Sequence, residues 1–336
     1  ERFRNNEQGM PTADINIQPS QVLVNDTVWN VSTAHILYYA KHLEIDNFSI
    51  NHDNQSITVN GRATDNNDTD KLTVLLNDVD VSYILDIVNF HSVEFAGRAT
   101  GKAQAHDIFG KPEAEAHLLV KDFTFEGGCL GTLDAHADWN LDEGAINIDA
   151  LTTDNQRKTK VDGYVSPKHN DIDLKIKADG TSLKFLETYC DTFMDSINAI
   201  GWGDVRVVGP LKAIQLVGQA RVEGSAKVSA LNTTYTLRGV SVKLQPNDIV
   251  FTNDSIYDRD GHLGVVNGHL WHQNLSNLSY NIEVNARNML GYDTHDFGEN
   301  TFYGTAYVTG KCTIKGKSGE VVIDVDATPE KGSRLV

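Results

Sequence analysis

Apolar and polar residues alternate in short segments throughout the stretch from residue 203 to residue 325. In one of these segments Val240, Val242 and Leu244 alternate with a serine and a lysine. Successive side chains of a β-strand point to opposite faces, so strict alternation gives each strand one apolar and one polar face. The repeated pattern predicts an amphipathic sheet. The functional question is therefore what covers the apolar face of that sheet.

The residues that share the apolar parity are expected to line one inner face. They are Ile146, Ile148, Ile172, Leu174, Ile176, Val205, Val207, Val240, Val242, Leu244, Ile249, Phe251, Ile282 and Val284. Their polar neighbours are expected on the outer face, because alternate residues of a strand line opposite faces. These neighbours include Lys175, Arg206, Lys243 and Glu283.

Turn-forming residues, such as Asn25-Asp26 and Asp46-Asn47, separate the alternating segments. Roughly twenty short strands follow one another at a spacing of about ten residues, which is typical of an all-β meander, sandwich or solenoid. The acidic stretch 65–70 is expected to be an exposed loop. It lacks the Gly and the downstream Glu of a calcium-binding hand loop, which disfavours a calcium site there.

Two segments have the spacing of amphipathic helices. The first covers about residues 80–90, follows Asp80 as a cap, and has Val81, Ile84, Leu85 and Val88 on its apolar stripe. The second covers 181–198, with Leu183, Leu186, Tyr189 or Cys190, Phe193 and Ile197 on its stripe. Both polar faces are acidic or neutral, whereas helices that bind membrane surfaces are rich in Lys and Arg. Each helix is therefore expected to cover the apolar face of the sheet locally.

Each predicted helix is followed by the same order of strand, glycine-containing turn and longer strand. This weak internal repeat divides the chain into a strand-rich part (1–79), a first helix-plus-strands repeat (80–180) and a second (181–336). Repetition of this kind favours an elongated architecture over a closed enzyme domain. The predicted fold class is mainly β, an elongated amphipathic sheet of many short strands with two short amphipathic helices.

The composition excludes several classes of protein. Asp and Glu number 46 against 29 Lys and Arg, which gives a formal net charge of −17. A nucleic acid partner is not expected, because binding to phosphates depends on dense Lys and Arg patches. The three cysteines are too few and too far apart for a disulfide framework or a paired-ligand metal site. No apolar run approaches the ~20 residues that span a bilayer.

No motif of the sequence supports catalysis. His262, His269 and His272 are the closest histidines, but 269 and 272 on one strand point to opposite faces and do not converge on a metal without a bulge. The segment 97–102 has one residue too few between its glycines for a phosphate-binding loop, and no Ser-centred nucleophile motif is present. We therefore predict a non-enzymatic protein without catalytic residues, cofactor or metal site.

The C-terminal third carries a family resemblance. The segments concerned are 264–272, 278–286, Met289-Leu290, 300–307 and Gly310 to Val321, together with Gly209-Pro210-Leu211 and 249–253 upstream. Their pattern of glycine and apolar positions resembles the terminal module of TamB-like translocation and assembly proteins, of the AsmA-like superfamily, in the version found in Bacteroidetes-type bacteria. The resemblance covers the chain from about residue 180 onward, and the first half matches only in style.

The resemblance implies a long, curved sheet folded like a taco, with a hydrophobic trough inside. It implies a periplasmic protein, held in the inner membrane by an anchor, that carries phospholipid acyl chains between the inner and outer membranes in outer-membrane biogenesis. The chain begins at Glu1 without a Met, so we expect it to be a piece of a longer protein whose anchor lies outside it. The alternative function that the resemblance implies is a scaffold for assembly or secretion of outer-membrane β-barrel proteins, together with a barrel partner of the TamA or BamA type.

Three interpretations other than lipid binding are open at this point. A scaffold would use exposed sheet edges to pair with strands of a client protein. An adhesin or carbohydrate-binding solenoid would explain the Asn-rich and Thr-rich strands, but aromatic residues make up only 8% of the chain. In a closed sandwich the apolar faces would simply bury each other.

Overall fold

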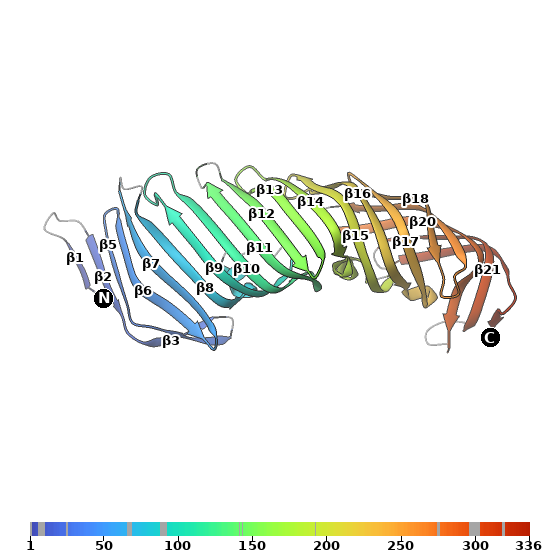
Figure 1. Cartoon of the computed structure of the whole chain (residues 1–336), viewed down its shortest axis with the longest axis horizontal. Coiled ribbons are helices and arrows are strands. Elements are labelled where there is room, and N and C mark those ends of the chain that lie inside the picture. The colour runs from blue at the N-terminus through green and yellow to red at the C-terminus, as the bar shows by residue number, and fades with distance from the viewer. Residues whose placement is uncertain are drawn as a thin grey trace. The chain divides into compact units, whose positions relative to one another are not determined.

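A computed structural model describes residues 2–5, 11–24, 26–65, 69–87, 93–140, 142, 144–191, 193–273, 276–295, 303–317 and 320–336. Within these residues, 23 strands belong to one open antiparallel sheet (Figure 1). The predicted class, a mainly β sheet of many strands with two short helices, is confirmed. Residues 66–68 of the acidic loop, Val88 of the first helical stripe, and residues 300–302 and 319 of the resembling segments lie outside the described residues.

The elements of the first half are β1 (Arg2–Asn5), β2 (Pro11–Ile17), β3 (Ser20–Val24), β4 (Thr27–Val31), β5 (Ala34–Tyr39), β6 (His42–His52), β7 (Gln55–Thr64), β8 (Lys71–Asp80), α1 (Val81–Ile87), β9 (Phe95–His106), β10 (Glu113–Phe125), β11 (Gly128–Asn140), β12 (Ala145–Asp154) and β13 (Arg157–Ser166). The second half contains β14 (Asp171–Ser182), the 3₁₀ turn η1 (Lys184–Leu186), α2 (Glu187–Cys190), β15 (Met194–Gly209), β16 (Gln215–Val228), the 3₁₀ turn η2 (Ser229–Leu231), β17 (Thr233–Gln245), β18 (Asp248–Tyr257), β19 (Leu263–Gln273), β20 (Ser276–Thr294), β21 (Gly304–Lys317), β22 (Glu320–Pro329) and β23 (Arg334–Leu335).

The chain divides into two compact units, each with its own hydrophobic core. Unit 1 comprises Glu1–Phe125, Leu130–Asn155 and Val161–Asp171. Unit 2 comprises Glu126–Cys129, Gln156–Lys160 and Ile172–Val336.

In unit 1 the strand register places apolar residues on one face of the sheet. One row of directly opposite residues runs across β6 to β10. Its members, one from each strand in turn, are Phe48, Val59, Val74, Ala103 and Ala116. Directly opposite residues of an antiparallel pair project to the same face. The row therefore crosses five strands without a polar residue, as the alternation predicts.

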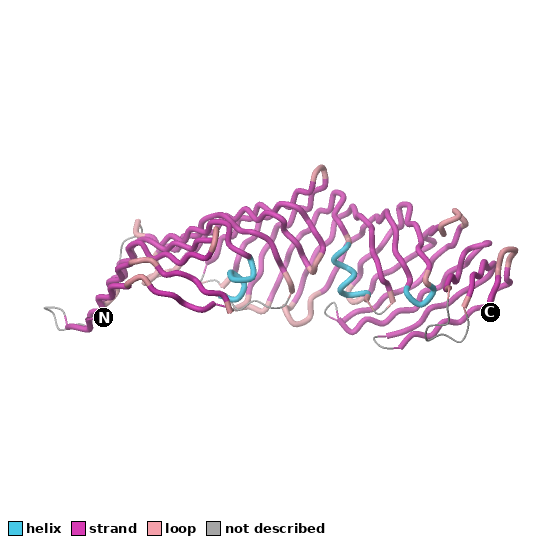
Figure 2. The backbone as a smooth tube through the Cα atoms, turned by 90° about the horizontal axis from the view of Figure 1, so that it is seen from below, coloured by secondary structure: helices cyan, strands magenta, loops and turns pink. Residues whose placement is uncertain are grey.

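Helix α1 covers part of the apolar face of unit 1, and Figure 2 shows it lying against the strands. Val81 is buried with Ala99, while the Tyr83 ring meets the Trp29 ring edge-on at 5.2 Å. The Asp80 carboxylate accepts hydrogen bonds from the backbone N–H (2.9 Å) and the hydroxyl (2.8 Å) of Ser82. Both the cap and the local covering of the sheet are confirmed for this helix.

The second helical segment is shorter than predicted. Helix ends at Cys190, and β15 begins at Met194, so Ile197 lies in a strand and the prediction of a helix over 181–198 was wrong. Ile197 is opposite Ala226 of β16 and only 6% exposed, so a ladder with a neighbouring strand overrides the helical spacing. The remaining turns still cover the sheet, because Leu186 and Cys190 pack against the core of unit 2.

Glycines let β15 and β16 approach closely at the centre of unit 2. Gly218 has φ +139°, a conformation that side chains with a Cβ rarely adopt. A Cβ at this position would lie 2.2 Å from the backbone oxygen of Asp204 on the partner strand. The ladder at this point therefore requires glycine for two separate reasons, its backbone angle and the lack of space.

Substitution Gly218→Ala should lower the free energy of unfolding by about 1–3 kcal/mol, through backbone strain and displacement of β15. The matched control is Gly127→Ala, because Gly127 also has positive φ (+71°) but has nothing within 4 Å of the added Cβ. Urea unfolding followed by circular dichroism measures both variants. Equal destabilisation of the two variants would contradict the role assigned to the close approach.

Candidate functional site: the inner face of unit 2

The candidate site is the apolar face of strands β14–β22 in unit 2, here named the inner face. One row of opposite residues begins with Ile176 and Val205 and continues through Gly218 to Leu244 and Ile249. Because opposite residues project to the same face, five successive strands contribute to one apolar row.

A second row runs beside the first. Val242 lies opposite Ala220 on one side and Phe251 on the other. The row continues from Phe251 through Gly268 to Ile282, and Ile282 lies opposite Ile314 of β21.

The remaining predicted residues of unit 2 extend these rows. Ile172 lies opposite Gly209, Leu174 opposite Val207, Val240 opposite Val222, and Val284 between Val266 and Cys312. All twelve predicted residues of unit 2 therefore share the inner face, and they lie on strands from β14 to β20.

Ile146 and Ile148 belong to unit 1, where β12 places them opposite Trp139 and Ala137 of β11. Both isoleucines are half-buried. They line an apolar face of unit 1 and are not part of the inner face of unit 2.

The inner face is only partly covered. Of the twelve residues in unit 2, Ile172 and Val240 are buried, at 8% and 6% exposure, and the other ten are half-buried. A closed core of this size would bury most of its apolar side chains completely, so this face keeps apolar surface accessible to a ligand.

The polar neighbours lie on the opposite, outer face. Lys175, Arg206 and Lys243 are exposed, whereas Glu283 is half-buried and its carboxylate lies 2.5 Å from Lys311 Nζ. The Arg206 guanidinium donates two hydrogen bonds to Asp173, and this pairing lowers the pKa of the Asp173 carboxyl.

The sheet of unit 2 curls over at one end of the inner face. The Tyr235 hydroxyl of β17 donates a 3.0 Å hydrogen bond to the Leu290 carbonyl of β20, which passes behind β16 and β17 in Figure 1. The rings of Phe193 and Tyr280 meet at 4.9 Å. Strands that are several positions apart in the ladder thus face each other across an apolar interior.

The side chains at this closed end are packed into the core of unit 2. Burial raises the pKa of the Tyr235 phenol to about 12 and the pKa of the Cys190 thiol to about 11. A thiol held in its neutral form is a poor nucleophile. The same surroundings suit an apolar ligand, which needs no polar partner.

A buried carboxylate fixes the curled end. Asp258, 3% exposed, accepts hydrogen bonds from the backbone N–H groups of Leu290 (2.7 Å), His262 (2.8 Å) and Asp260 (2.9 Å). Burial by itself raises the pKa of this carboxyl, but these hydrogen bonds outweigh burial and hold the pKa below its usual value. Asp258 thus joins the turn after β18 to the irregular part of β20, where the pairing with β21 shifts register.

Asp293 forms a second polar link close by. Its carboxylate accepts hydrogen bonds from Thr305 Oγ1 (2.7 Å) and Arg259 Nη1 (2.5 Å), and its carbonyl accepts one from Asn232 Nδ2 (2.5 Å). Burial by itself raises the pKa of the Asp293 carboxyl. The hydrogen bonds from Thr305 and Arg259 together outweigh burial, so the pKa lies below its usual value. Side chains from β20, β21 and the turns after β16 and β18 therefore meet at one acid.

The histidines considered from the sequence do not converge. The His269 ring is 2.9 Å from Asp248 and stacks on Trp271, while His272 is buried after a shift of register. The Asp258 carboxylate accepts a 2.9 Å hydrogen bond from Nδ1 of His262.

Several inner-face residues were absent from the sequence prediction, among them Ala220, Val222, Val266, Leu270 and Ile314. Each lies opposite a predicted residue or next to one in the ladder. Only a known strand register would have added them, because their own segments contain glycines that interrupt the alternation.

Comparison of the chain with protein families, with curated proteins and with solved structures gives no significant match. The resemblance to TamB-like proteins therefore stays an interpretation of the sequence. Within the described residues, no helix is both long and apolar enough to cross a membrane.

Substitution Asp258→Asn should lower the free energy of unfolding at pH 7 by about 2–3 kcal/mol, since hydrogen bonds to a charged group contribute more than neutral ones. The folded pKa is lowered, so the stabilisation by Asp258 is present above the unfolded value of about 3.9 and is lost as the pH falls through the folded value. The difference in stability between wild type and variant should therefore shrink on acidification below about pH 4. Urea unfolding at pH 7 and pH 3 measures it, with Asp204→Asn, an exposed position on β15, as the control. A variant as stable as the wild type at pH 7 would rule out the linking role.

Proposed function

We propose that the inner face of unit 2 binds acyl chains of phospholipids, without catalysing a reaction. The observation that carries this proposal is the set of mostly half-buried apolar residues that share one face across β14–β21, on strands whose other face carries charged residues. Such a surface offers apolar contact on one side and leaves the head group in water.

The energetics favour this kind of ligand. A 16-carbon acyl chain loses more than ~10 kcal/mol of stabilisation when it moves from an apolar environment into water, at about 0.8 kcal/mol per methylene. An apolar surface that continues over many strands removes most of this barrier. Neither an acid, a base nor a metal is needed for that task.

The biological setting of the proposal rests on the sequence resemblance. By that resemblance, the protein would work in the periplasm and carry phospholipid between the inner and outer membranes, in contact with a β-barrel partner of the TamA or BamA type. The curled sheet and the accessible inner face support the proposal, since a carrier of acyl chains needs both enclosure and an apolar lining.

A second candidate function, a scaffold for outer-membrane β-barrel proteins, is favoured by β22. Within the described residues, β22 pairs only with β21, so its other edge is free for a further strand. Val321, Val322 and Val325 on this strand are 41%, 47% and 61% exposed. Natural edge strands are usually protected by charge, proline or short length, and an exposed apolar edge can pair with a client strand.

A photocrosslinking amino acid at Val242, on the inner face, should crosslink to phospholipid vesicles with 16-carbon chains. The same group at the neighbouring Lys243, on the outer face, should give background yield. Val242→Glu and Ile282→Lys should each reduce lipid binding at least about tenfold, because a charge on an apolar path must be desolvated or must draw in water. Lys243→Glu should change binding little, since exposed charges contribute little.

Circular dichroism and thermal unfolding of each variant separate loss of binding from loss of folding. The crosslinking comparison between positions 242 and 243 needs no charged variant and therefore gives an independent answer. Equal crosslinking at both positions, with normal lipid binding by the folded charge variants, would refute acyl-chain binding at the inner face.

The scaffold function predicts a different pattern. The variant Val322→Lys, which lies opposite Lys315 on the outer face, should reduce capture of an unfolded outer-membrane β-barrel protein at least several-fold, because charge on an edge strand opposes pairing. The same variant should keep crosslinking at position 242. Pull-down of the barrel protein after dilution from urea measures capture, and unchanged capture would exclude β22 as the client site.

A further inference from the structure

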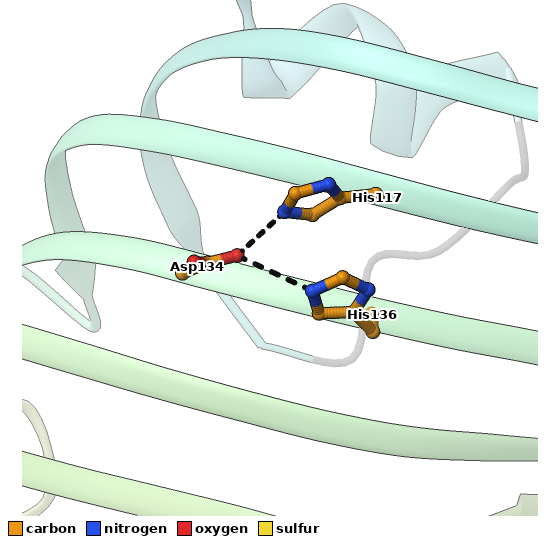
Figure 3. A group of neighbouring side chains, drawn as sticks. All are labelled: His117, Asp134 and His136. Atoms are coloured by element: carbon orange, nitrogen blue, oxygen red, sulfur yellow. Dashed lines mark hydrogen bonds and ion pairs between the residues drawn. The ribbon is translucent and has the colours of Figure 1, made fainter.

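Three side chains meet on the polar face of unit 1, away from its apolar rows. His117 comes from β10, and Asp134 and His136 come from β11 (Figure 3). His117 Nε2 lies 2.7 Å and His136 Nε2 lies 3.7 Å from the same carboxylate oxygen, Oδ1 of Asp134. All three side chains are exposed.

The ladders hold these residues in position. Asp134 and His136 are two residues apart on β11, so they project to the same face, and they lie opposite Leu151 and Asp149 of β12. His117 lies opposite Lys102 of β9. Both ligand-bearing strands thus have a paired neighbour on the far side, which fixes the backbone beneath the cluster.

The two imidazoles are arranged side by side. Their rings stack with centroids 3.9 Å apart and planes inclined by 14°, and both direct Nε2 at Asp134. Two protonated rings at this separation would repel each other. A cation placed between the two nitrogens and the carboxylate would instead be attracted to all three groups.

The geometry fits a first-row transition metal ion. One ligand atom from each residue lies within 4.8 Å of the others. A tetrahedral zinc ion with metal–ligand distances of about 2.0–2.2 Å needs its ligand atoms roughly 3.3 Å apart. Small side-chain rotations bring the three atoms to this spacing, because the side chains are exposed and no packed core restrains them. A ligand set of two imidazoles and one carboxylate suits Zn²⁺, Cu²⁺ or Ni²⁺ better than Ca²⁺ or Mg²⁺.

A second group of possible metal ligands, in unit 2, is less suitable for binding an ion. Asp258, Asp260 and His262 are also close together, but the Asp258 carboxylate already accepts three backbone hydrogen bonds and is buried. The Asp258 carboxylate is therefore already occupied by hydrogen bonds that stabilise the fold of unit 2. In the part of the chain that the structure describes, no backbone N–H donates to the cluster in unit 1, and its exposure leaves room for a water molecule at the fourth ligand position.

We propose that His117, Asp134 and His136 form a binding site for a divalent transition metal ion, most readily Zn²⁺, which ties β10 to β11 on the polar face of unit 1. The site is independent of acyl-chain binding. The formal net charge of −17 also favours accumulation of cations around the protein.

Isothermal titration of the untagged protein with ZnCl₂ tests the proposal. We expect Zn²⁺ to bind at one site. The variants His117→Ala, Asp134→Asn and His136→Ala should each weaken the affinity for Zn²⁺ at least about tenfold. Acid should also weaken the affinity, because the ligand nitrogens must be unprotonated. His106→Ala is the matched control: this histidine also lies in unit 1, on β9, with a carboxylate of Glu115 at 3.8 Å. Zn²⁺ should also raise the melting temperature of the wild type relative to EDTA, and should not do so for the three variants.

Melting curves in EDTA show whether each variant folds, and His136→Gln replaces any alanine variant that does not. The proposal is overturned if the wild type binds no Zn²⁺. It is equally overturned if the three ligand variants bind as tightly as the wild type, or if His106→Ala weakens binding as much as they do.

Discussion

The register of the antiparallel ladders is the constraint on which the rest of this structure depends. Opposite residues project to the same face, so one consistent register turns separate alternating segments into continuous apolar and polar surfaces. A slip of one residue between β16 and β17 would bring Lys243 and Ser241 to the inner face in place of Val242 and Val240. Both the hydrophobic core of unit 2 and the proposed ligand surface would be lost together.

A sheet with one apolar face must cover that face, and this chain covers each unit only in part. In unit 1, α1 and Trp29 bury one region, where Val79 and Ala99 are fully buried. In unit 2, the short helical turns and the curled end of the sheet bury Ile197, Tyr235 and Met289. The apolar residues farther along the strands remain half-buried. Burial at one end supplies stability, and the partly covered remainder supplies an accessible surface.

Polar groups make the curl of unit 2 possible. Where β20 leaves its regular pairing with β21, backbone N–H groups lose their strand partners, and buried groups of this kind must be satisfied in another way. Asp258 accepts from Leu290, and Tyr235 donates to the carbonyl of the same residue. Both polar groups of one irregular residue are therefore satisfied by side chains from β17 and the turn after β18.

Much of the fold followed from the alternation in the sequence, because period-two patterns report directly on strands. The parity of Val242, Ile249 and Ile282 follows from their own segments. The sequence did not reveal which residues lie opposite them, because register depends on turns and bulges elsewhere. At Ile197 the sequence pattern led to a wrong prediction. Its segment has the spacing of an amphipathic helix, but Ile197 pairs with Ala226 of β16 and belongs to a strand.

Long-range convergence was also beyond the sequence. His117 and His136 are 19 positions apart, and only the pairing of their strands brings their rings to 3.9 Å. The hydrogen bond between Tyr235 and Leu290 spans 55 positions and depends on the curl of the whole unit. His262 and His269, which are neighbours along the chain, instead contact different carboxylates, those of Asp258 and Asp248.

The direction of the apolar rows determines how a ligand would lie on the inner face. The rows run across the strands, with a step of about 4.8 Å from each strand to the next. A flexible acyl chain laid along a row would meet Val205, Gly218, Leu244 and Ile249 in turn. Glycine removes a side chain at that step, so the row is lower there than at its neighbours. An apolar row has no group that recognises a head group, and selection among lipids on this face would therefore depend on chain length and shape.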